Sequence, residues 1–152
     1  MDKLNRRILA HLLTDGRATF AEIGAAVGLS APAVKRRVDA MQARGEITGF
    51  TVVADPRSLG WSVEAYTEIF CRGNQTPAHL RAEFGSIASI VELFTVTGDA
   101  DAMARIVASS MAEMEQVVER IRESPNVERT RTSMVMSRVI DRPYRGMDPA
   151  SR

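Results

Sequence analysis

Hydrophobic residues follow a helical spacing at the start of the chain, and strand-like and helix-like patterns alternate after residue 60. The apolar positions that share one face of a first predicted helix are Leu4, Ile8, Leu9, Leu12 and Leu13. Asp15-Gly16 is a turn signal that ends this helix. The pattern therefore predicts a helical domain followed by a mixed domain, and so an α+β protein.

A short second helix is predicted directly after this turn. Phe20, Ile23 and Val27 recur at helical intervals and give the helix one apolar face. Thr19 precedes them and is suited to cap the helix, and Gly28 is the residue type that favours a helix end. We therefore expect a compact supporting helix.

A third helix follows after only a short turn. Ser30 is predicted to cap it, and Pro32 falls in its first turn, where the missing backbone N–H does no harm. The residues predicted to face inward are Val34, Val38 and Met41. This leaves on the outer side three cations and two small residues: Ala33, Lys35, Arg36, Arg37 and Ala40.

The two short helices together predict a DNA-reading helix-turn-helix. Small residues let a helix approach a groove closely, and the cations suit phosphates or guanine edges. A charge run alone usually marks a solvated helix face, but a capped basic helix directly after a compact helix favours DNA binding. The predicted DNA-binding residues are Thr19, Ser30, Ala31, Ala33, Lys35, Arg36 and Arg37.

The segment after Arg44 is predicted to close this domain. Gly45 breaks the helix, and residues 47–56 (ITGFTVVADP) alternate enough to predict a short β-hairpin or wing that leads to a turn at Asp55-Pro56. We expect a DNA-binding domain over residues 1–50 and a wing or hinge linker over 51–60.

The rest of the chain predicts the element order βαββαβ over residues 61–141. The expected elements are a strand over Trp61–Cys71, a helix over Thr76–Phe84, strands over Ile87–Thr97 and Met103–Ala108, a helix opened by a Ser110/Glu113 capping box, and a strand over Val127–Ile140. This order predicts a ferredoxin-like antiparallel sheet with two helices on one face. Because the other face stays uncovered, self-association is expected. Residues 142–152 are expected to form a flexible tail.

Charge and composition agree with this division and exclude other chemistry. The formal net charge is +1, but residues 1–60 hold nine Lys/Arg against six Asp/Glu, so the basic character lies with the predicted DNA-binding domain. A lone Cys71 excludes an internal disulfide, and without a long apolar run we expect a reduced, cytoplasmic protein. His11 and His79 have no ligand partner at metal spacing, and no phosphate loop or nucleophile motif occurs. No metal or cofactor is expected.

Four segments of the chain resemble the Lrp/AsnC (feast/famine) family of transcription regulators. They are DGRATFAEIGAAVGLSAPAVKRRVDAM, GEITGFTVVADPRSLG, VTGDADAMARI and PNVERTRTSMVM, and the resemblance covers nearly the full chain. The resemblance implies a winged helix-turn-helix domain, a sheet domain of the RAM/AsnC type, double-stranded DNA as partner, and a homodimer that assembles to higher oligomers. It also implies a small effector, usually an amino acid, bound where dimers meet.

The resemblance places the effector near a loop between two strands of the sheet and near the last strand. The implied effector residues are Gly98, Asp99, Ala100, Asp101, Thr132 and Met134. Many members carry aromatics where this chain has Ala100 and Ala102, so its pocket is larger, takes a different ligand or is vacant. From the residues alone, a Gly-Asp corner is as often a plain hairpin turn; if an amino acid binds, Asp99 or Asp101 accepts its ammonium.

Three other functions stay open from the sequence. One is an effector-less orphan regulator. Another is an enzyme on the same scaffold, of the sirohaem-decarboxylase type, which would have no need for Lys35, Arg36 and Arg37. The last is a stand-alone amino-acid-binding module, which the intact helix-turn-helix disfavours. We expect a regulator and not an enzyme.

Overall fold

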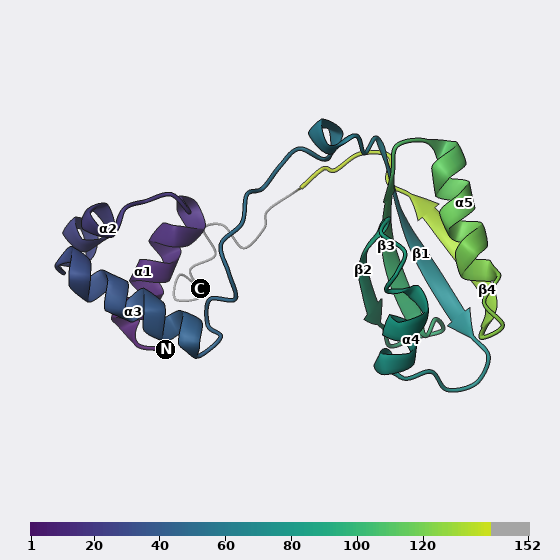
Figure 1. The fold of residues 1–152 in the computed structure, drawn as a ribbon, viewed down its shortest axis with the longest axis horizontal. Coiled ribbons are helices and arrows are strands. Elements are labelled where there is room, and N and C mark those ends of the chain that lie inside the picture. The colour runs from purple at the N-terminus through teal and green to yellow at the C-terminus, as the bar shows by residue number, and fades with distance from the viewer. Residues whose placement is uncertain (141–152) are drawn as a thin grey trace. The chain divides into compact units, whose positions relative to one another are not determined.

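The computed structural model describes residues 1–140, and its chain divides into two compact units, Met1–Val53 and Ala54–Val139. Figure 1 shows a first unit made of helices and a second unit built on a sheet. The tail predicted over residues 142–152 lies outside the described residues. No described helix is long and apolar enough to cross a membrane.

The first unit is the three-helix domain that the apolar spacing predicts. It consists of α1 (Lys3–Thr14), α2 (Phe20–Val27) and α3 (Ala31–Ala43). Their inward faces meet in one buried cluster made of Ile8, Leu12, Ile23, Val27, Val34, Val38, Met41 and Ile47. The predicted inward positions of α3 are therefore confirmed.

Local hydrogen bonds begin and end α2 as predicted. The hydroxyl of Thr19 accepts the Glu22 N–H at 3.2 Å, and the Glu22 carboxylate accepts the Thr19 N–H at 2.7 Å, which completes a capping box. Gly28 has a φ of 78°, a left-handed conformation that suits glycine at a helix end. These features fix the turn between α2 and α3.

Ser30 differs from its prediction. It occupies the N-cap position of α3, but its side chain makes no capping hydrogen bond. The reason is local: Pro32 has no N–H, and the Ala33 and Val34 N–H groups both donate to the Ser30 carbonyl at 3.0 Å. The exposed Ser30 hydroxyl is consequently left available to another partner.

The predicted wing hairpin is wrong. Residues 44–55 contain no β-strand, and Phe50, Val52 and Val53 are 53%, 86% and 67% exposed. A strand needs a neighbour to take up its backbone hydrogen bonds, and nothing in this segment folds back to provide one. A short 3₁₀ helix, η1 (Pro56–Leu59), then leads into the sheet unit.

The sheet unit has the predicted βαββαβ order. Its elements are β1 (Val63–Cys71), α4 (Pro77–Phe84), β2 (Ile90–Thr95), β3 (Ala102–Ala108), α5 (Met111–Arg122) and β4 (Val127–Met134). The strands form one sheet in the order β2-β3-β1-β4, and each pair is antiparallel. The predicted α+β fold is confirmed.

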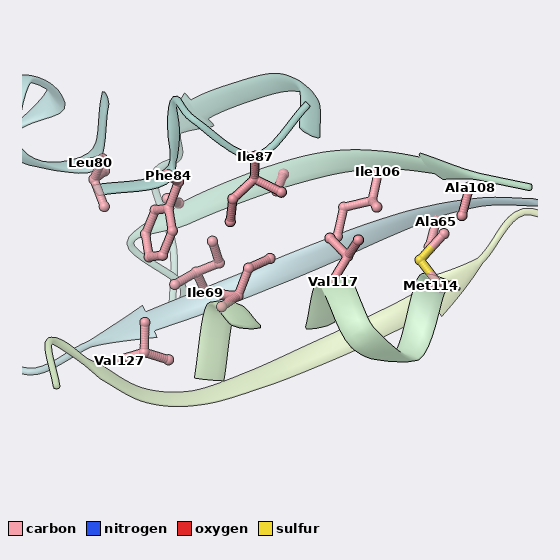
Figure 2. Packing of buried hydrophobic residues seen from close by; sticks show 13 residues of the cluster. Ala65, Ile69, Leu80, Phe84, Ile87, Ile106, Ala108, Met114, Val117 and Val127 are labelled. Carbon is pink, nitrogen blue, oxygen red and sulfur yellow. The ribbon is translucent and has the colours of Figure 1, made fainter. Parts of the chain in front are cut away.

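Both helices of the sheet unit cover the same face of the sheet. In Figure 2, Phe84 of α4 and Met114 and Val117 of α5 pack with Ile69 of β1 and Ile106 of β3. The inward positions of β3 are otherwise alanines, which let the helices lie close to the strands. The opposite face carries no helix among the described residues, as the sequence predicts.

Two details of this unit depart from expectation. β4 ends at Met134 and not at Ile140, because its partner strand β1 begins only at Val63. The last hydrogen bond between the two strands is donated by the Val135 N–H to the Glu64 carbonyl, at 2.9 Å. At α5, the Ser110 hydroxyl caps the Glu113 N–H, but the Glu113 carboxylate returns to Ser109 and not to Ser110. The capping box is thus shifted by one residue on one side.

Candidate functional site

The outer side of α3 is the candidate DNA-reading surface. Pro32, Lys35, Arg36 and Asp39 are exposed, whereas Val34, Val38 and Met41 on the opposite side are buried. The half-buried alanines Ala33 and Ala40 lie one turn before and one turn after Arg36, so no bulky neighbour flanks that arginine along the helix. This surface combines a cation with close backbone access.

The three consecutive cations of α3 have different surroundings. Lys35 Nζ lies 2.6 Å from the Asp39 carboxylate one turn later, an exposed pair of the weak i,i+4 kind. Arg37 Nη1 donates to Asp2 Oδ2 and to Asn5 Oδ1, both at 2.8 Å. Arg36 is exposed and has no ion pair or hydrogen bond within the described chain.

A groove of about 580 Å³ runs between α3 and the start of α1. Arg36, Arg37 and Arg44 line it with Ala33 and Ala40. Arg44 binds the Glu46 carboxylate through two nitrogens, at 3.0 and 3.1 Å, and these hydrogen bonds lower the pKa of Glu46. Because Arg37 and Arg44 are held by carboxylates, Arg36 is the arginine of this groove that remains free to bind a ligand.

Thr19 and Ser30 are the two hydroxyl residues predicted to bind DNA. Thr19 is exposed at the start of α2. Its hydroxyl already donates to the Glu22 carboxylate at 2.7 Å while it accepts the Glu22 N–H. Ser30, by contrast, is exposed with an unengaged hydroxyl, and Ala31 lies half-buried beside it. The structure thus places Ser30 and Ala31 at the start of α3 and Lys35 and Arg36 on its exposed side, whereas Thr19 lies at the start of α2. Arg37 is turned toward the start of α1.

Sequence reasoning missed Asp2 and Asn5. Asp2 caps α1 by accepting the Asn5 N–H at 2.7 Å, and this bond, followed by that from Arg37, lowers the pKa of Asp2. Asn5 is only 5% exposed. An Asp before an apolar run signals a helix cap, but no sequence pattern shows that the same carboxylate binds a residue of α3.

In the sheet unit, the loop between β2 and β3 contains the predicted effector residues. Gly98 has a φ of 129°, a conformation that L side chains rarely adopt. The Asp101 N–H donates to the Ile69 carbonyl at 3.0 Å, and the Asp101 carboxylate accepts the Cys71 N–H at 2.7 Å. Asp101 therefore ties the loop to the end of β1.

The two aspartates of this loop have different surroundings. Burial, helped by the Asp101 and Glu83 charges, raises the pKa of the Cys71 thiol, which indicates that Asp101 faces β1. The Glu68 carboxylate, hydrogen-bonded to Arg131, raises the pKa of that guanidinium, and Asp99 adds to the effect. Asp99 is exposed and makes no hydrogen bond among the described residues.

The remaining predicted effector residues lie deeper in the fold. Ala100 is 8% exposed, and Ala102 is fully buried opposite Ile69. The side chain of Ala102 therefore belongs to the protein's own core, and its small size affects core packing. The idea that Ala102 enlarges a ligand pocket is therefore not supported by its position. Thr132 and Met134 face α5: the Thr132 hydroxyl is 3.0 Å from that of Thr67, and Met134 packs against the core.

Register also separates Met134 from the loop within one chain. Met134 pairs with Ala65, whereas the loop is bound to Ile69, four residues farther along β1. A site that uses both would need residues from more than one copy of the chain. Among the described residues, no group of three His, Cys, Asp or Glu side chains is arranged to hold a metal ion.

The uncovered face of the sheet carries apolar and charged side chains on neighbouring strands. Tyr66 and Phe94 are 36% and 43% exposed. Tyr66 pairs with Arg105, and the half-buried Met103 pairs with Phe94 on one side and with Glu68 on the other. One row of ion pairs runs from Glu92 of β2 through Arg105 of β3 and Glu64 of β1 to Arg138, which follows β4, with contacts of 2.6 to 3.3 Å. The other pairs Glu68 with Arg131. Exposed aromatic side chains together with methionine and arginine are typical of a protein interface.

Comparisons with known proteins agree with both units. The model of the AsnC-type helix-turn-helix domain matches residues 1–42, and that of the Lrp/AsnC ligand binding domain matches residues 64–144. The HTH-type transcriptional regulator Rv2324 of Mycobacterium tuberculosis is 51% identical over 93% of this chain and 96% of its own. Relatives of this kind are named as transcriptional regulators, and none of these matches supports the enzyme alternative.

Solved structures show the same two-domain fold. Escherichia coli AsnC superposes with a TM-score of 0.87 at 25% identity, covering 94% of this chain and 97% of its own. The feast or famine regulatory protein of M. tuberculosis, solved in complex with L-methionine, gives 0.85 at 27% identity, covering 92% and 95%. With both domain models matched and a relative at 51% identity along nearly its full length, the chain belongs to the Lrp/AsnC family of helix-turn-helix transcriptional regulators.

Proposed function

We propose that this regulator recognises its operator by placing α3 in the major groove of double-stranded DNA, with Arg36 as the cation that contacts a guanine edge or a phosphate. The observation that carries this proposal is the contrast within the basic run: Lys35 and Arg37 are paired with carboxylates, whereas exposed Arg36 lacks a described partner. Ala33 and Ala40 on either side allow close approach, and the free Ser30 hydroxyl suits a phosphate at the start of the helix.

Titration of labelled DNA from upstream of the regulator's own gene tests this proposal, with a shuffled duplex as reference. Arg36→Ala should cost about 1–3 kcal/mol on the specific site if Arg36 reads guanine, with lost preference at that base. A phosphate contact should weaken both duplexes alike and reduce the salt slope by about one. Arg81→Ala, an equal charge loss on exposed α4, is the matched control. Unchanged affinity and slope in Arg36→Ala would refute the proposal.

The uncovered face of the sheet is our proposed homodimer surface. Its Tyr66, Met103 and Phe94 side chains are exposed or half-buried in a single chain, and the Glu and Arg ion pairs beside them add polar contacts of the kind found at interfaces. A dimer presents two reading helices, so the operator should be pseudo-palindromic, with half-sites about one helical turn apart or a multiple of it. Assembly of such dimers to higher oligomers, in the cytoplasm with the DNA, completes this proposal.

The loop from Gly98 to Asp101 is our proposed site for an amino-acid effector, completed by Thr132 and Met134 of another copy. The described contacts support a division of labour in which Asp101 holds the loop against β1 and Asp99 is free to accept an ammonium. Calorimetric titration with the standard amino acids, followed by DNA binding with any ligand found, tests this assignment. Heat from no amino acid would instead favour an orphan regulator.

A further inference from the structure

We propose that Arg37 is a positioning residue, which holds the reading helix α3 against the start of α1 through Asp2 and Asn5 and does not read DNA itself. This inference rests on the proposed use of α3 for DNA reading. Within the described chain, the hydrogen bonds between α1 and α3 are both donated by Arg37 Nη1, to Asp2 Oδ2 and to Asn5 Oδ1. We call this set of three residues the α1–α3 anchor.

The three residues of the anchor satisfy one another's hydrogen bonds and charges. Asn5 is 5% exposed, and every buried side-chain nitrogen or oxygen of the described residues has a hydrogen-bond partner. Arg37 supplies the partner of the Asn5 carbonyl oxygen, so removing Arg37 leaves a buried acceptor without its donor. Asp2 carries the complementary charge and holds the Asn5 backbone at the same time.

The anchor lies at the start of α1, where the hydrophobic core is represented only by the partly buried Leu4. The first fully buried apolar residue of α1 is Ile8, and the residues before Leu4 are exposed. Arg37 follows Arg36 directly and lines the same groove. A change at Asp2 can therefore shift the guanidinium of Arg37 and the backbone beside Arg36, although Asp2 itself need not touch DNA.

The direction in which one substitution, Asp2→Asn, changes DNA affinity distinguishes the anchor from a simple electrostatic effect. Asp2→Asn keeps a good helix-capping side chain, so α1 should remain capped, but it removes the charge that holds Arg37. Loss of an acidic group beside a DNA-binding surface should by itself strengthen binding to a polyanion. The anchor predicts the opposite: Asp2→Asn should weaken DNA binding roughly two- to fivefold. This is the factor that corresponds to the free energy of an exposed charge pair.

The experiment measures specific DNA affinity against salt concentration for the full chain and for Asp2→Asn, Arg37→Ala, Arg37→Lys and the Asp2→Asn/Arg37→Ala double variant. Circular dichroism at the assay temperature reports that each variant is folded. The anchor predicts a loss of affinity in both disruptive single variants, larger in Arg37→Ala because that variant also leaves Asn5 without its donor, and no further loss in the double variant relative to Arg37→Ala. It also predicts partial rescue by lysine and an unchanged salt slope. Asp39→Asn, which removes an acid from α3 without touching the anchor, should bind at least as tightly as wild type.

Two results would overturn the anchor. One is a loss of DNA affinity in Arg37→Ala while Asp2→Asn binds DNA normally, with the salt slope of Arg37→Ala reduced by about one or its preference at one base relaxed. Arg37 would then contact DNA itself. The other is full affinity in both single variants. Absence of specific binding by the wild type would instead contradict the proposed function, so the two failures are distinguishable.

Discussion

Gly24 on α2 is the position where one added methyl group tests the geometry of the helix-turn-helix most sharply. A Cβ atom built on Gly24 would lie 2.4 Å from the carbonyl oxygen of Leu29, which belongs to the turn before α3. Ordinary contact begins at 3.4 Å, so the two backbones would have to separate by about 1 Å. The Gly28 and Leu29 N–H groups both donate to the Gly24 carbonyl at 2.9 Å, so this shift also strains the turn.

The expected cost follows from two opposing terms. Overpacking a buried site costs about 1–3 kcal/mol, and the atom that must move here is main chain, which places the cost in the upper part of that range. Alanine in place of glycine stabilises a helix by up to about 1 kcal/mol. We therefore expect Gly24→Ala to lower the free energy of unfolding of the helical unit by about 2 kcal/mol, and its Tm by about 10 °C or more.

Thermal unfolding of the full chain measures this loss, because the two units carry different probes. The single tryptophan, Trp61, lies in the sheet unit and reports that unit by fluorescence, whereas circular dichroism also follows the helical unit. Gly49→Ala is the matched control, since a Cβ there meets nothing within 4 Å. A Gly24→Ala protein whose helical unit is as stable as wild type would refute the close packing of α2 against the turn.

Three further predictions concern the sheet unit. A fragment of residues 54–140 should be a folded dimer at micromolar concentration by light scattering, since it holds its own core and the proposed interface, and a folded monomer would remove the basis for the operator geometry. Burial opposes ionisation of Glu64, but hydrogen bonds from Arg138 and Arg105 outweigh it and hold its pKa below the usual value. This carboxylate therefore stabilises the fold above about pH 4.3, and the contribution is lost as pH falls through the lowered pKa; Glu64→Gln should flatten that part of an acid unfolding curve, and an unchanged curve would contradict it. Asp99→Asn should weaken binding of the best amino-acid ligand in calorimetry while ligand-free DNA affinity stays unchanged, and equal ligand affinity would move the ammonium site elsewhere.

Local chemistry explains which parts of the fold were predictable from sequence. Thr19 with Glu22, and Gly28 at a positive φ, act within a few residues of themselves, so their roles follow from sequence position. The hydrophobic segment 47–55 shows the opposite case. Its alternation predicts a strand, but a strand exists only with a neighbour, and the single chain supplies none there.

In the candidate sites, too, some features were predictable from sequence and others depended on the packed structure. The outward direction of Arg36 follows from helical spacing, but the pairing of Arg37 with Asp2 joins residues 35 apart in sequence and needed the packed structure. Thr132 and Met134 face the helices because of the register between β4 and β1. A slip of one residue would have turned both to the other face, and sequence alternation alone does not fix that register.

Methylation interference on the operator is the most direct test of the central claim, that α3 reads DNA through Arg36. Methylation of guanine N7 blocks the major-groove edge to which an arginine binds. We predict interference at a guanine in each half-site for the wild type and for Arg81→Ala, and loss of that interference in Arg36→Ala. Interference that persists unchanged in Arg36→Ala, or that is absent from both half-sites in the wild type, would contradict base reading by Arg36.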